Sequence, residues 1–144
     1  MKGVPVYFSL GTNQGDRRAN IDEALRRLDK ALGRPYEALS SIIESTAWGF
    51  DGADFLNCVV RYRTARRPER LLRICKRIER AMGRRETLEY DAEGRRIYHD
   101  RPIDIDILLY GDERVDTPDL QIPHPLMRQR DFIMRPLEEI FPEN

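Results

Sequence analysis

Hydrophobic and polar residues alternate near the start of the chain, over Val4–Leu10, and this run leads into the turn-forming Gly11-Thr12-Asn13. The pattern predicts a β-strand followed by a tight turn. From about Asp16 the apolar residues instead recur every three to four positions, which predicts a helix that Gly33 ends. The apolar residues of this helix are Ile21, Ala24, Leu25, Leu28 and Leu32.

The middle of the chain contains two more predicted strands and a second predicted helix. Leu39–Ser45 and Phe55–Thr64 are the strands, and residues 46–54 join them in a loop that contains glycine and aspartate. Pro68 is typical of a first helical turn, and the apolar stripe that follows it ends at Gly83. The members of that stripe are Leu71, Leu72, Cys75, Ile78 and Met82.

The next segment shows no periodicity. Residues 84–100 are polar and include Gly94, so we expect a long mobile loop, and such loops in compact domains usually have a function. After the loop, Ile103–Tyr110 predicts a strand, whereas Leu126–Arg130 and Met134–Ile140 predict two short helical pieces.

The resulting order is β-α-β-β-α-β with a short helical tail. This order predicts an α+β fold, a ferredoxin-like sandwich in which two helices pack on one face of a mostly antiparallel, four-stranded sheet. The chain has 144 residues and shows no internal repeat or linker, so residues 1–144 are expected to form one catalytic domain.

Composition excludes several classes of protein. The longest apolar runs, such as Ile103–Tyr110, are far shorter than a membrane span, and the N-terminal segment lacks the features of a signal peptide. Both cysteines, Cys58 and Cys75, occupy apolar positions of periodic segments. We therefore expect buried, reduced thiols and a cytoplasmic protein.

Charge is balanced over the whole chain but unevenly distributed along it. The chain has 25 basic and 25 acidic residues, yet residues 66–101 contain 12 basic and 7 acidic ones, and residues 102–144 contain 4 and 10. A basic segment followed by an acidic one suits a polyanion held through bridging cations. An ordinary mixed surface explains the same distribution.

Asp104 and Asp106 are the most informative candidates for chemistry. In a strand over Ile103–Tyr110 they point to one face, with Cα atoms roughly 6.5–7 Å apart, while the isoleucines between them point to the other. Two carboxylates this close repel each other unless a cation neutralises them, and Mg²⁺ shared with substrate phosphates suits such a pair. The alternative is a half-exposed strand whose polar face simply meets water.

Two further groups of residues suggest binding sites. His124 lies between Pro123 and Pro125, which restrict its backbone, and together with Arg130 it could bind phosphate or transfer a proton, although such a histidine is more often a turn residue bonded to the backbone. The aromatic rings of Trp48 and Phe55 and the amide of Asn57 suit a flat heterocycle, although spacing alone favours a core ring and a turn contact.

Several segments together resemble the 6-hydroxymethyl-7,8-dihydropterin pyrophosphokinase family of folate biosynthesis. Glycine-rich phosphate-binding and dinucleotide-binding motifs are absent from the sequence. The resemblance covers nearly the whole chain, and its most specific part is the Arg-x-x-Asp-x-Asp segment followed by Pro-His-Pro. It rests on Tyr7–Asn13, Phe55–Asn57, Arg101–Gly111, Ile122–Pro125, Arg130–Phe132 and Arg135–Leu137.

The resemblance implies an enzyme that transfers the terminal diphosphate of ATP to the hydroxymethyl oxygen of the pterin and releases AMP. It implies two Mg²⁺ ions bound by Asp104 and Asp106, with Arg84, Arg101, Asp104 and Asp106 as the catalytic residues. The ATP-binding residues that it implies are Lys76, Glu79, Tyr98, Arg101, Ile107, His124 and Arg130. The pterin-binding residues that it implies are Ser45, Thr46, Trp48, Phe55, Asn57 and Phe132, with the two phenylalanine rings on either side of the pterin.

Three positions depart from the family pattern. Lys76 stands where the family often has glutamine, Tyr98 where a tryptophan is common, and Glu86 where a second arginine is frequent. Each of the three falls among residues expected near the nucleotide or in the loop over the substrates.

Two other functions compete with this interpretation. An RNA-binding module shares the predicted fold, but no strand matches its aromatic motif, and zero net charge argues against strong binding to a phosphate backbone. A metal-dependent nucleotidyltransferase or phosphatase shares the carboxylate pair and would release other products. We expect a monomer that binds small-molecule substrates, no nucleic acid and no membrane.

Overall fold

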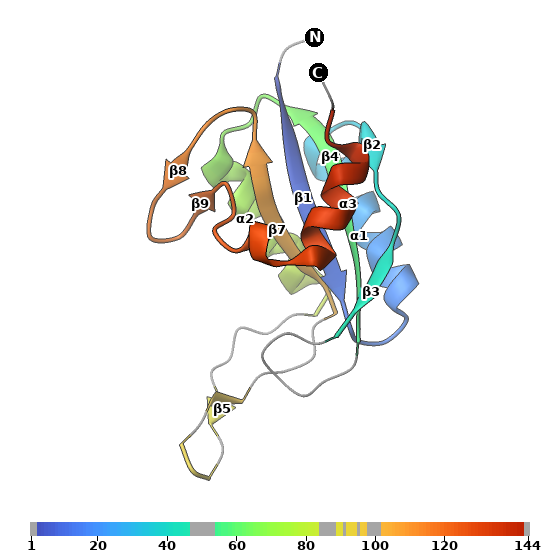
Figure 1. Cartoon of the computed structure of the whole chain (residues 1–144), viewed down its shortest axis with the longest axis vertical. Coiled ribbons are helices and arrows are strands. Elements are labelled where there is room, and N and C mark those ends of the chain that lie inside the picture. Colours follow the sequence, from blue (N-terminus) through green and yellow to red (C-terminus); the bar gives the residue numbers. More distant parts are fainter. Residues whose placement is uncertain are drawn as a thin grey trace.

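The alternating segment at the start of the chain forms a central strand of the main β-sheet. The computed structural model describes residues 3–46, 54–83, 89–90, 92–94, 96–97 and 102–142. The strands of this sheet are β1 (Val4–Thr12), β2 (Ala38–Leu39), β3 (Ile43–Ser45), β4 (Phe55–Thr64) and β7 (Asp104–Tyr110). Their order is β2-β4-β1-β7, with β3 also paired to β4, and every pairing is antiparallel (Figure 1).

The helices form where the apolar spacing predicts them. They are α1 (Arg17–Leu32), α2 (Pro68–Ala81), the short 3₁₀ helix η1 (Met127–Gln129) and α3 (Asp131–Ile140). At the start of α1 the Asp16 carboxylate accepts a hydrogen bond from the Ala19 N–H, and Gly33 ends the helix in the left-handed conformation, with φ at 75°.

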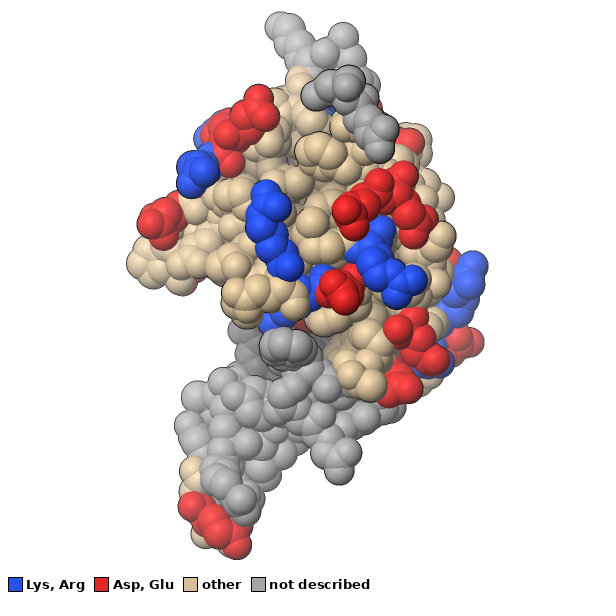
Figure 2. All heavy atoms as spheres, in the orientation of Figure 1, with Lys and Arg blue, Asp and Glu red and all other residues tan. Residues whose placement is uncertain are grey.

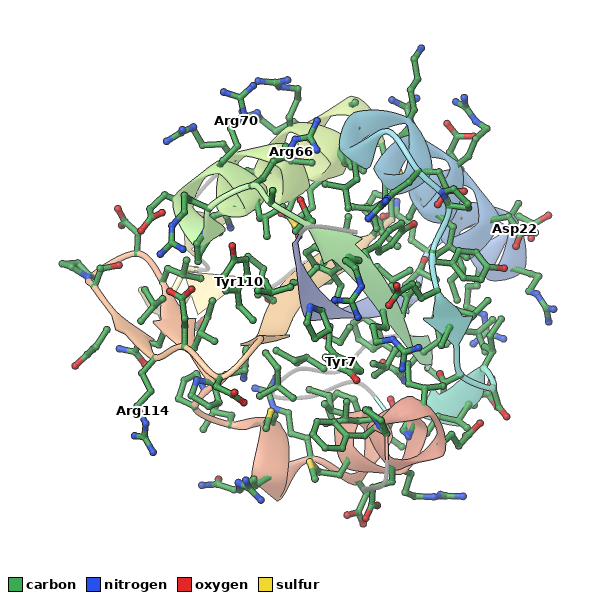
Figure 3. All side chains as sticks on the ribbon, turned by 90° about the horizontal axis from the view of Figure 1, so that it is seen from above. Tyr7, Asp22, Arg66, Arg70, Tyr110 and Arg114 are labelled. Atoms are coloured by element: carbon green, nitrogen blue, oxygen red, sulfur yellow. The ribbon has the colours of Figure 1, made fainter. Side chains whose placement is uncertain are left out.

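The two faces of the sheet have separate hydrophobic cores, because side chains of a strand alternate between faces. Helices α1 and α2 cover one face, and α3 covers the other (Figures 1 and 3). Tyr7 lies on the α3 side, whereas the Tyr110 hydroxyl donates a hydrogen bond to the Arg66 carbonyl near the start of α2. The α3-side core consists of Tyr7, Val59, Leu108, Met127, Ile133 and Leu137.

The predicted fold class is confirmed: the sheet is antiparallel and the architecture is that of a ferredoxin-like sandwich. The predicted helical tail is confirmed as well, and α3 begins a turn earlier than the pattern indicated. Pro136 lies inside α3 and donates no hydrogen bond, yet the helix continues because Ile133 and Leu137 pack on the sheet. The molecule therefore has a third layer.

Three expectations about the strands were incomplete or wrong. The segment predicted as one strand over Leu39–Ser45 is broken into β2 and β3 at Ser40, whose backbone N–H still donates to the Val59 carbonyl but whose hydroxyl, in place of a backbone carbonyl, accepts the Val59 N–H. Within the predicted irregular stretch 84–100, β5 (Glu89–Tyr90) pairs with β6 (Arg96–Ile97). A hairpin of β8 (Val115–Asp116) and β9 (Gln121–Ile122) was not predicted.

Both cysteines are buried and form no disulfide, as predicted. Burial raises the pKa of the Cys58 thiol to about 12, so this thiol is protonated at neutral pH. Within the described part of the chain, every helix is too short or too polar to cross a membrane.

Candidate active site

Three strands bring candidate residues into one row across the sheet. Gly11 on β1 is in register with Asn57 on β4 and with Asp104 on β7, and all three positions belong to the face that α3 covers. With strands about 4.8 Å apart, Asn57 and Asp104 are separated by roughly 10 Å. The residue between them is glycine, so β1 contributes no side chain at this position.

The lack of a side chain at position 11 has a visible cause. A Cβ atom there would lie 3.2 Å from Asn57 Oδ1, which is tighter than ordinary packing, and 3.5 Å from Cδ1 of Phe55, which is an ordinary contact. Gly11 therefore allows the Asn57 amide and the Phe55 ring to lie against β1. These are the amide and one of the rings expected to bind the pterin.

A hydrogen bond fixes the orientation of the Asn57 amide. Asn57 is buried, and its Nδ2 donates to Ser45 Oγ across the β3–β4 pair, at 2.7 Å. Because Nδ2 is the donor, Oδ1 is turned toward Gly11. The structure thus brings Ser45, Asn57 and Phe55 together at one end of the sheet, with exposed Thr46 directly after Ser45.

An arginine holds the strand ends beside this group. Arg17 Nη1, at the start of α1, donates to Glu44 Oε2 at 2.9 Å and to the Asp54 carbonyl at 2.9 Å. Glu44 lies in β3 and Asp54 directly precedes β4. The two hydrogen bonds fasten both strand ends to the same helix.

Asp104 and Asp106 both lie half-buried on β7, the strand at the opposite edge of the sheet from β2 and β3. Ile103, Ile105 and Ile107 point into the core with α1 and α2, so the aspartates share the α3 face as predicted. This alternation ends after Leu108: a bulge leaves Leu108 without a register partner on β1, and Leu109 packs on the α3 side as well. The carboxylate pair therefore occupies the regular part of the strand, before the bulge.

A cavity of about 360 Å³ opens beside Asp106. The β7 edge forms one wall, Leu72 and Lys76 of α2 another, and the turn between β8 and β9 a third. Its lining residues are Leu72, Lys76, Ile105, Asp106, Ile107, Pro118, Asp119, Leu120, Gln121, His124 and Pro125. Lys76, Asp106, Ile107 and His124 are thus brought together as expected, while Leu72 and the residues of the turn were missed.

His124 is held against the bulged end of β7 and is partly buried. Its backbone N–H donates to the Leu108 carbonyl at 3.0 Å, and its Nδ1 accepts from the Leu126 N–H at 3.2 Å. We therefore assign the proton of the neutral ring to Nε2, which makes Nε2 a donor. Burial lowers the pKa of His124 below its usual value, Arg130 lowers it further, and Asp104 partly opposes them.

Arg130, a candidate phosphate ligand, and Phe132, a candidate pterin-stacking ring, lie next to each other. The Arg130 guanidinium carbon lies 5.7 Å from the centre of the Phe132 ring, within cation–π range. Arg130 is the last residue before α3, and Phe132 lies in its first turn, so α3 holds both on the same face as Asp104. A candidate phosphate ligand and a candidate pterin-stacking ring thus adjoin.

Glu79 and Lys76 extend from α2 toward β7. The Glu79 side chain is 2% exposed, and its Oε2 accepts a hydrogen bond from the Ile105 N–H at 2.8 Å. Lys76 Nζ lies 3.9 Å from Glu79 Oε1. Trp48, Arg84, Tyr98 and Arg101, which were also expected in the site, lie outside the described residues.

The donor set at the β7 edge fits a hard divalent cation. In the described part of the chain, no cluster of three or more His, Cys, Asp or Glu side chains is arranged to hold a metal. Two carboxylates alone suit Mg²⁺, which takes its remaining ligands from water and substrate phosphates. On the face seen in Figure 2, basic and acidic side chains are interspersed.

Comparison with known proteins shows the family to which the chain belongs. The family model described as 7,8-dihydro-6-hydroxymethylpterin-pyrophosphokinase matches residues 7–142. The 2-amino-4-hydroxy-6-hydroxymethyldihydropteridine pyrophosphokinase of Porphyromonas gingivalis is 43% identical over 139 residues, which cover 95% of this chain and 90% of that protein. The Aquifex aeolicus enzyme of the same name is 41% identical over 138 residues, covering 95% and 80%.

A longer relative contains the same region as one part of its chain. The mitochondrial folate synthesis bifunctional protein of Pisum sativum is 38% identical over 136 residues, which cover 94% of this chain and 25% of that protein.

The family match and the relatives define an enzyme that transfers a diphosphate group from ATP. The chain belongs to the 7,8-dihydro-6-hydroxymethylpterin-pyrophosphokinase family. Its activity is the transfer of diphosphate to the pterin in folate biosynthesis.

Proposed function

We propose that the chain transfers the terminal diphosphate of ATP in a reaction that depends on Mg²⁺, with Asp104 and Asp106 as the metal ligands. The observation that supports this most directly is the pair of half-buried carboxylates on the β7 edge, beside a cavity that a lysine and a histidine also line. When bound, two Mg²⁺ ions would neutralise charge on the ATP phosphates.

The cavity supplies the ATP site in this proposal. Ile107 provides an apolar wall for the nucleotide, and Lys76 supplies positive charge near its phosphates. His124 donates a hydrogen bond from Nε2 to a phosphate oxygen, because Nδ1 already accepts the Leu126 N–H. Arg130 adds a second cationic donor from the α3 side, and Arg84, Tyr98 and Arg101 remain ATP-site predictions from the sequence.

The pterin lies at the Asn57 end of the row formed by Asn57, Gly11 and Asp104. Asn57 hydrogen-bonds the heterocycle, with its amide oriented by Ser45, and Phe55 and Phe132 stack on the two sides of the ring. The backbone of Ser45, Thr46 and Trp48 supplies further contacts. Because Gly11 contributes no side chain between Asn57 and Asp104, the hydroxymethyl group extends across this position toward Asp104.

The transfer step needs positioning and charge neutralisation more than covalent chemistry. The hydroxymethyl oxygen attacks the β-phosphorus, the bond between that phosphorus and the bridging oxygen of the α-phosphate breaks, and AMP leaves. The hydroxyl proton passes to solvent water on the side of Asp104. Arg130 and His124 hold phosphate oxygens while charge shifts to the leaving AMP.

Product analysis tests the proposal. Purified protein is incubated with ATP and Mg²⁺, with and without 6-hydroxymethyl-7,8-dihydropterin, and the nucleotides are separated by chromatography. We expect one AMP per pterin diphosphate, no ADP, and no turnover once a chelator removes Mg²⁺. Formation of ADP, AMP release that needs no pterin, or full activity with the chelator would each contradict it.

Three properties remain predictions. The chain is expected to act as a monomer, in the cytoplasm and on small molecules alone. The two buried, unpaired cysteines are compatible with a reducing compartment. Sedimentation of the purified protein measures the first of these properties directly.

A further inference from the structure

Glu79 has an unusual place for a carboxylate in this protein. It projects from α2, it is 2% exposed, and it does not line the cavity, although Lys76 and Ile105, on either side of it, do. A buried carboxylate is costly because it loses its hydration, so it needs compensating contacts. Those contacts show what Glu79 does.

The first contact is with the backbone of the metal-binding strand. Glu79 Oε2 accepts the Ile105 N–H at 2.8 Å, and Ile105 is the residue between Asp104 and Asp106. Because β7 is an edge strand, this N–H points away from β1 and has no neighbouring strand to receive it. Glu79 therefore acts as the strand partner at this point.

The second contact is with the basic wall of the cavity. Glu79 Oε1 lies 3.9 Å from Lys76 Nζ, one helical turn earlier on α2. That distance is within ion-pair range and beyond hydrogen-bond range. One carboxylate oxygen of Glu79 thus contacts the backbone of β7, between the two aspartates, and the other faces the ammonium group of Lys76 on α2.

A comparison within the sheet argues that strand pairing alone does not need a charge. At the break between β2 and β3, the Ser40 hydroxyl accepts the Val59 N–H at 2.8 Å. A neutral side chain satisfies a strand N–H there without the cost of burying a carboxylate. At the β7 edge the acceptor is the end of a longer side chain, which reaches from α2 to the Ile105 N–H, so its length sets the distance between α2 and the aspartates.

We propose that Glu79 is a positioning residue for the diphosphate-transfer site, acting through Ile105 and Lys76 rather than by touching the nucleotide. The inference rests on the proposed function, since it assigns the aspartates to Mg²⁺. Residues that orient metal ligands from behind typically change metal affinity by 10- to 100-fold. Glu79 fixes the position of the strand segment from which Asp104 and Asp106 project. It also fixes the position of Lys76 on the opposite side of the cavity.

Two substitutions at position 79 separate the effect of side-chain length from the effect of charge. Glu79→Gln keeps an oxygen that reaches the Ile105 N–H but has no charge, whereas Glu79→Asp keeps the charge on a side chain one methylene too short. Glu69→Gln, on the exposed first turn of the same helix, is the matched control for loss of a charge.

Two readouts are independent of catalysis. Hydrogen exchange of the Ile105 amide, measured by NMR, reports the hydrogen bond itself. Calorimetric titration with Mg²⁺ and a non-hydrolysable ATP analogue reports the assembled site. For Glu79→Asp we expect about 10-fold faster exchange and about 10-fold weaker binding. For Glu79→Gln and for the Glu69 control we expect exchange and binding within about 3-fold of the wild type.

The opposite order overturns the proposal. If Glu79→Gln binds the analogue as weakly as Glu79→Asp while its Ile105 amide stays protected, charge and not position is what matters. Wild-type binding by Glu79→Asp, despite fast exchange, would likewise overturn it. Failure of the wild-type protein to bind the analogue at all would instead contradict the proposed function, and the exchange result would still stand.

Discussion

The two edges of the main sheet solve the same structural problem in different ways. At the β2–β3 edge, polar groups of the protein pair with one another: Ser40 with the Val59 N–H, and Glu37 with Arg61 and Arg63. At the β7 edge, Glu79 satisfies the Ile105 N–H, but the neighbouring polar groups face a cavity of about 360 Å³.

The difference between the edges separates stability from function. Charges that pair within the protein, such as Glu37 with Arg63, stabilise the fold and leave little capacity for a ligand. Two neighbouring aspartates, with a lysine and a histidine nearby, repel each other unless a cation binds between them. We therefore expect substitutions at the β7 edge to change activity more than stability, and those at the β2–β3 edge to do the reverse.

The largest expected effect is on activity, from Asp106→Asn at the cavity wall. Loss of one metal-binding charge should lower kcat by about 10²- to 10³-fold, because an amide holds Mg²⁺ and the shifting phosphate charge less well. The free energy of unfolding without Mg²⁺ should stay the same or rise slightly, since repulsion with Asp104 is relieved. Rates of AMP formation and urea denaturation measure the two quantities.

Asp116→Asn is the matched control, since Asp116 is an exposed carboxylate of β8 away from the lining of the cavity. It should leave both quantities within error. A stability loss in Asp106→Asn as large as its activity loss would assign the aspartate to the fold, and the comparison of the two edges would fail.

The second effect, on stability, comes from Ser40→Ala at the other edge. Ser40 and Val59 are both buried, so the substitution leaves the Val59 N–H without its acceptor. Such a group costs about 1–3 kcal/mol of unfolding free energy. We expect that loss in urea denaturation, with kcat and both KM values unchanged.

Ser41→Ala gives the comparison for this variant. Its hydroxyl bonds Glu139 Oε1 at 2.7 Å in an exposed position, where water can replace it, so the cost should be below about 1 kcal/mol. Equal losses in the two serine variants would show that burial does not determine the cost. A fall in kcat for Ser40→Ala would show that this edge also contributes to the site.

Regular elements could be predicted because their patterns are local. The spacing of Ile21, Leu25 and Leu28 is sufficient for α1, and Asp16 and Gly33 fix its ends. The aspartates could be placed on one face from a period of two alone, since the bulge begins only at Leu108. Period alone favours a solvated strand, and the metal site was predicted because Arg101 and an arginine-rich segment precede the pair.

What the sequence left out depends on contacts between distant residues. The break at Ser40 needs the Val59 N–H nineteen positions away, and the Glu79–Ile105 hydrogen bond joins a helix to a strand across 26 positions. The spacing of α2 does place Glu79 on the apolar stripe, four residues after Cys75, but an acidic side chain gives no reason to expect burial. The β8–β9 hairpin had a signal that was overlooked: Thr117-Pro118-Asp119 is turn chemistry between apolar residues.

The smallest expected effect, from Glu37→Gln, depends on pH. Burial alone would raise the pKa of Glu37, but hydrogen bonds from Arg63 and Arg61 outweigh it, and the pKa lies below the usual 4.5. A carboxyl group with a lowered pKa in the folded state stabilises the protein fully above the unfolded-state pKa, and that contribution is lost as the pH falls through the lowered value. At pH 7 the variant should therefore lose about 0.5–1 kcal/mol of unfolding free energy.

At a pH below the lowered value, wild type and variant should be equally stable, because both then carry a neutral group at position 37. Urea denaturation at a series of pH values from 7 to about 3 measures the difference, in which titration of all other groups cancels. Glu138→Gln, on the exposed side of α3, is the control and should be as stable as the wild type at every pH. A Glu37→Gln difference that persists at the lowest pH would mean that the side chain contributes by packing, and then the β2–β3 edge would not be held together by charge.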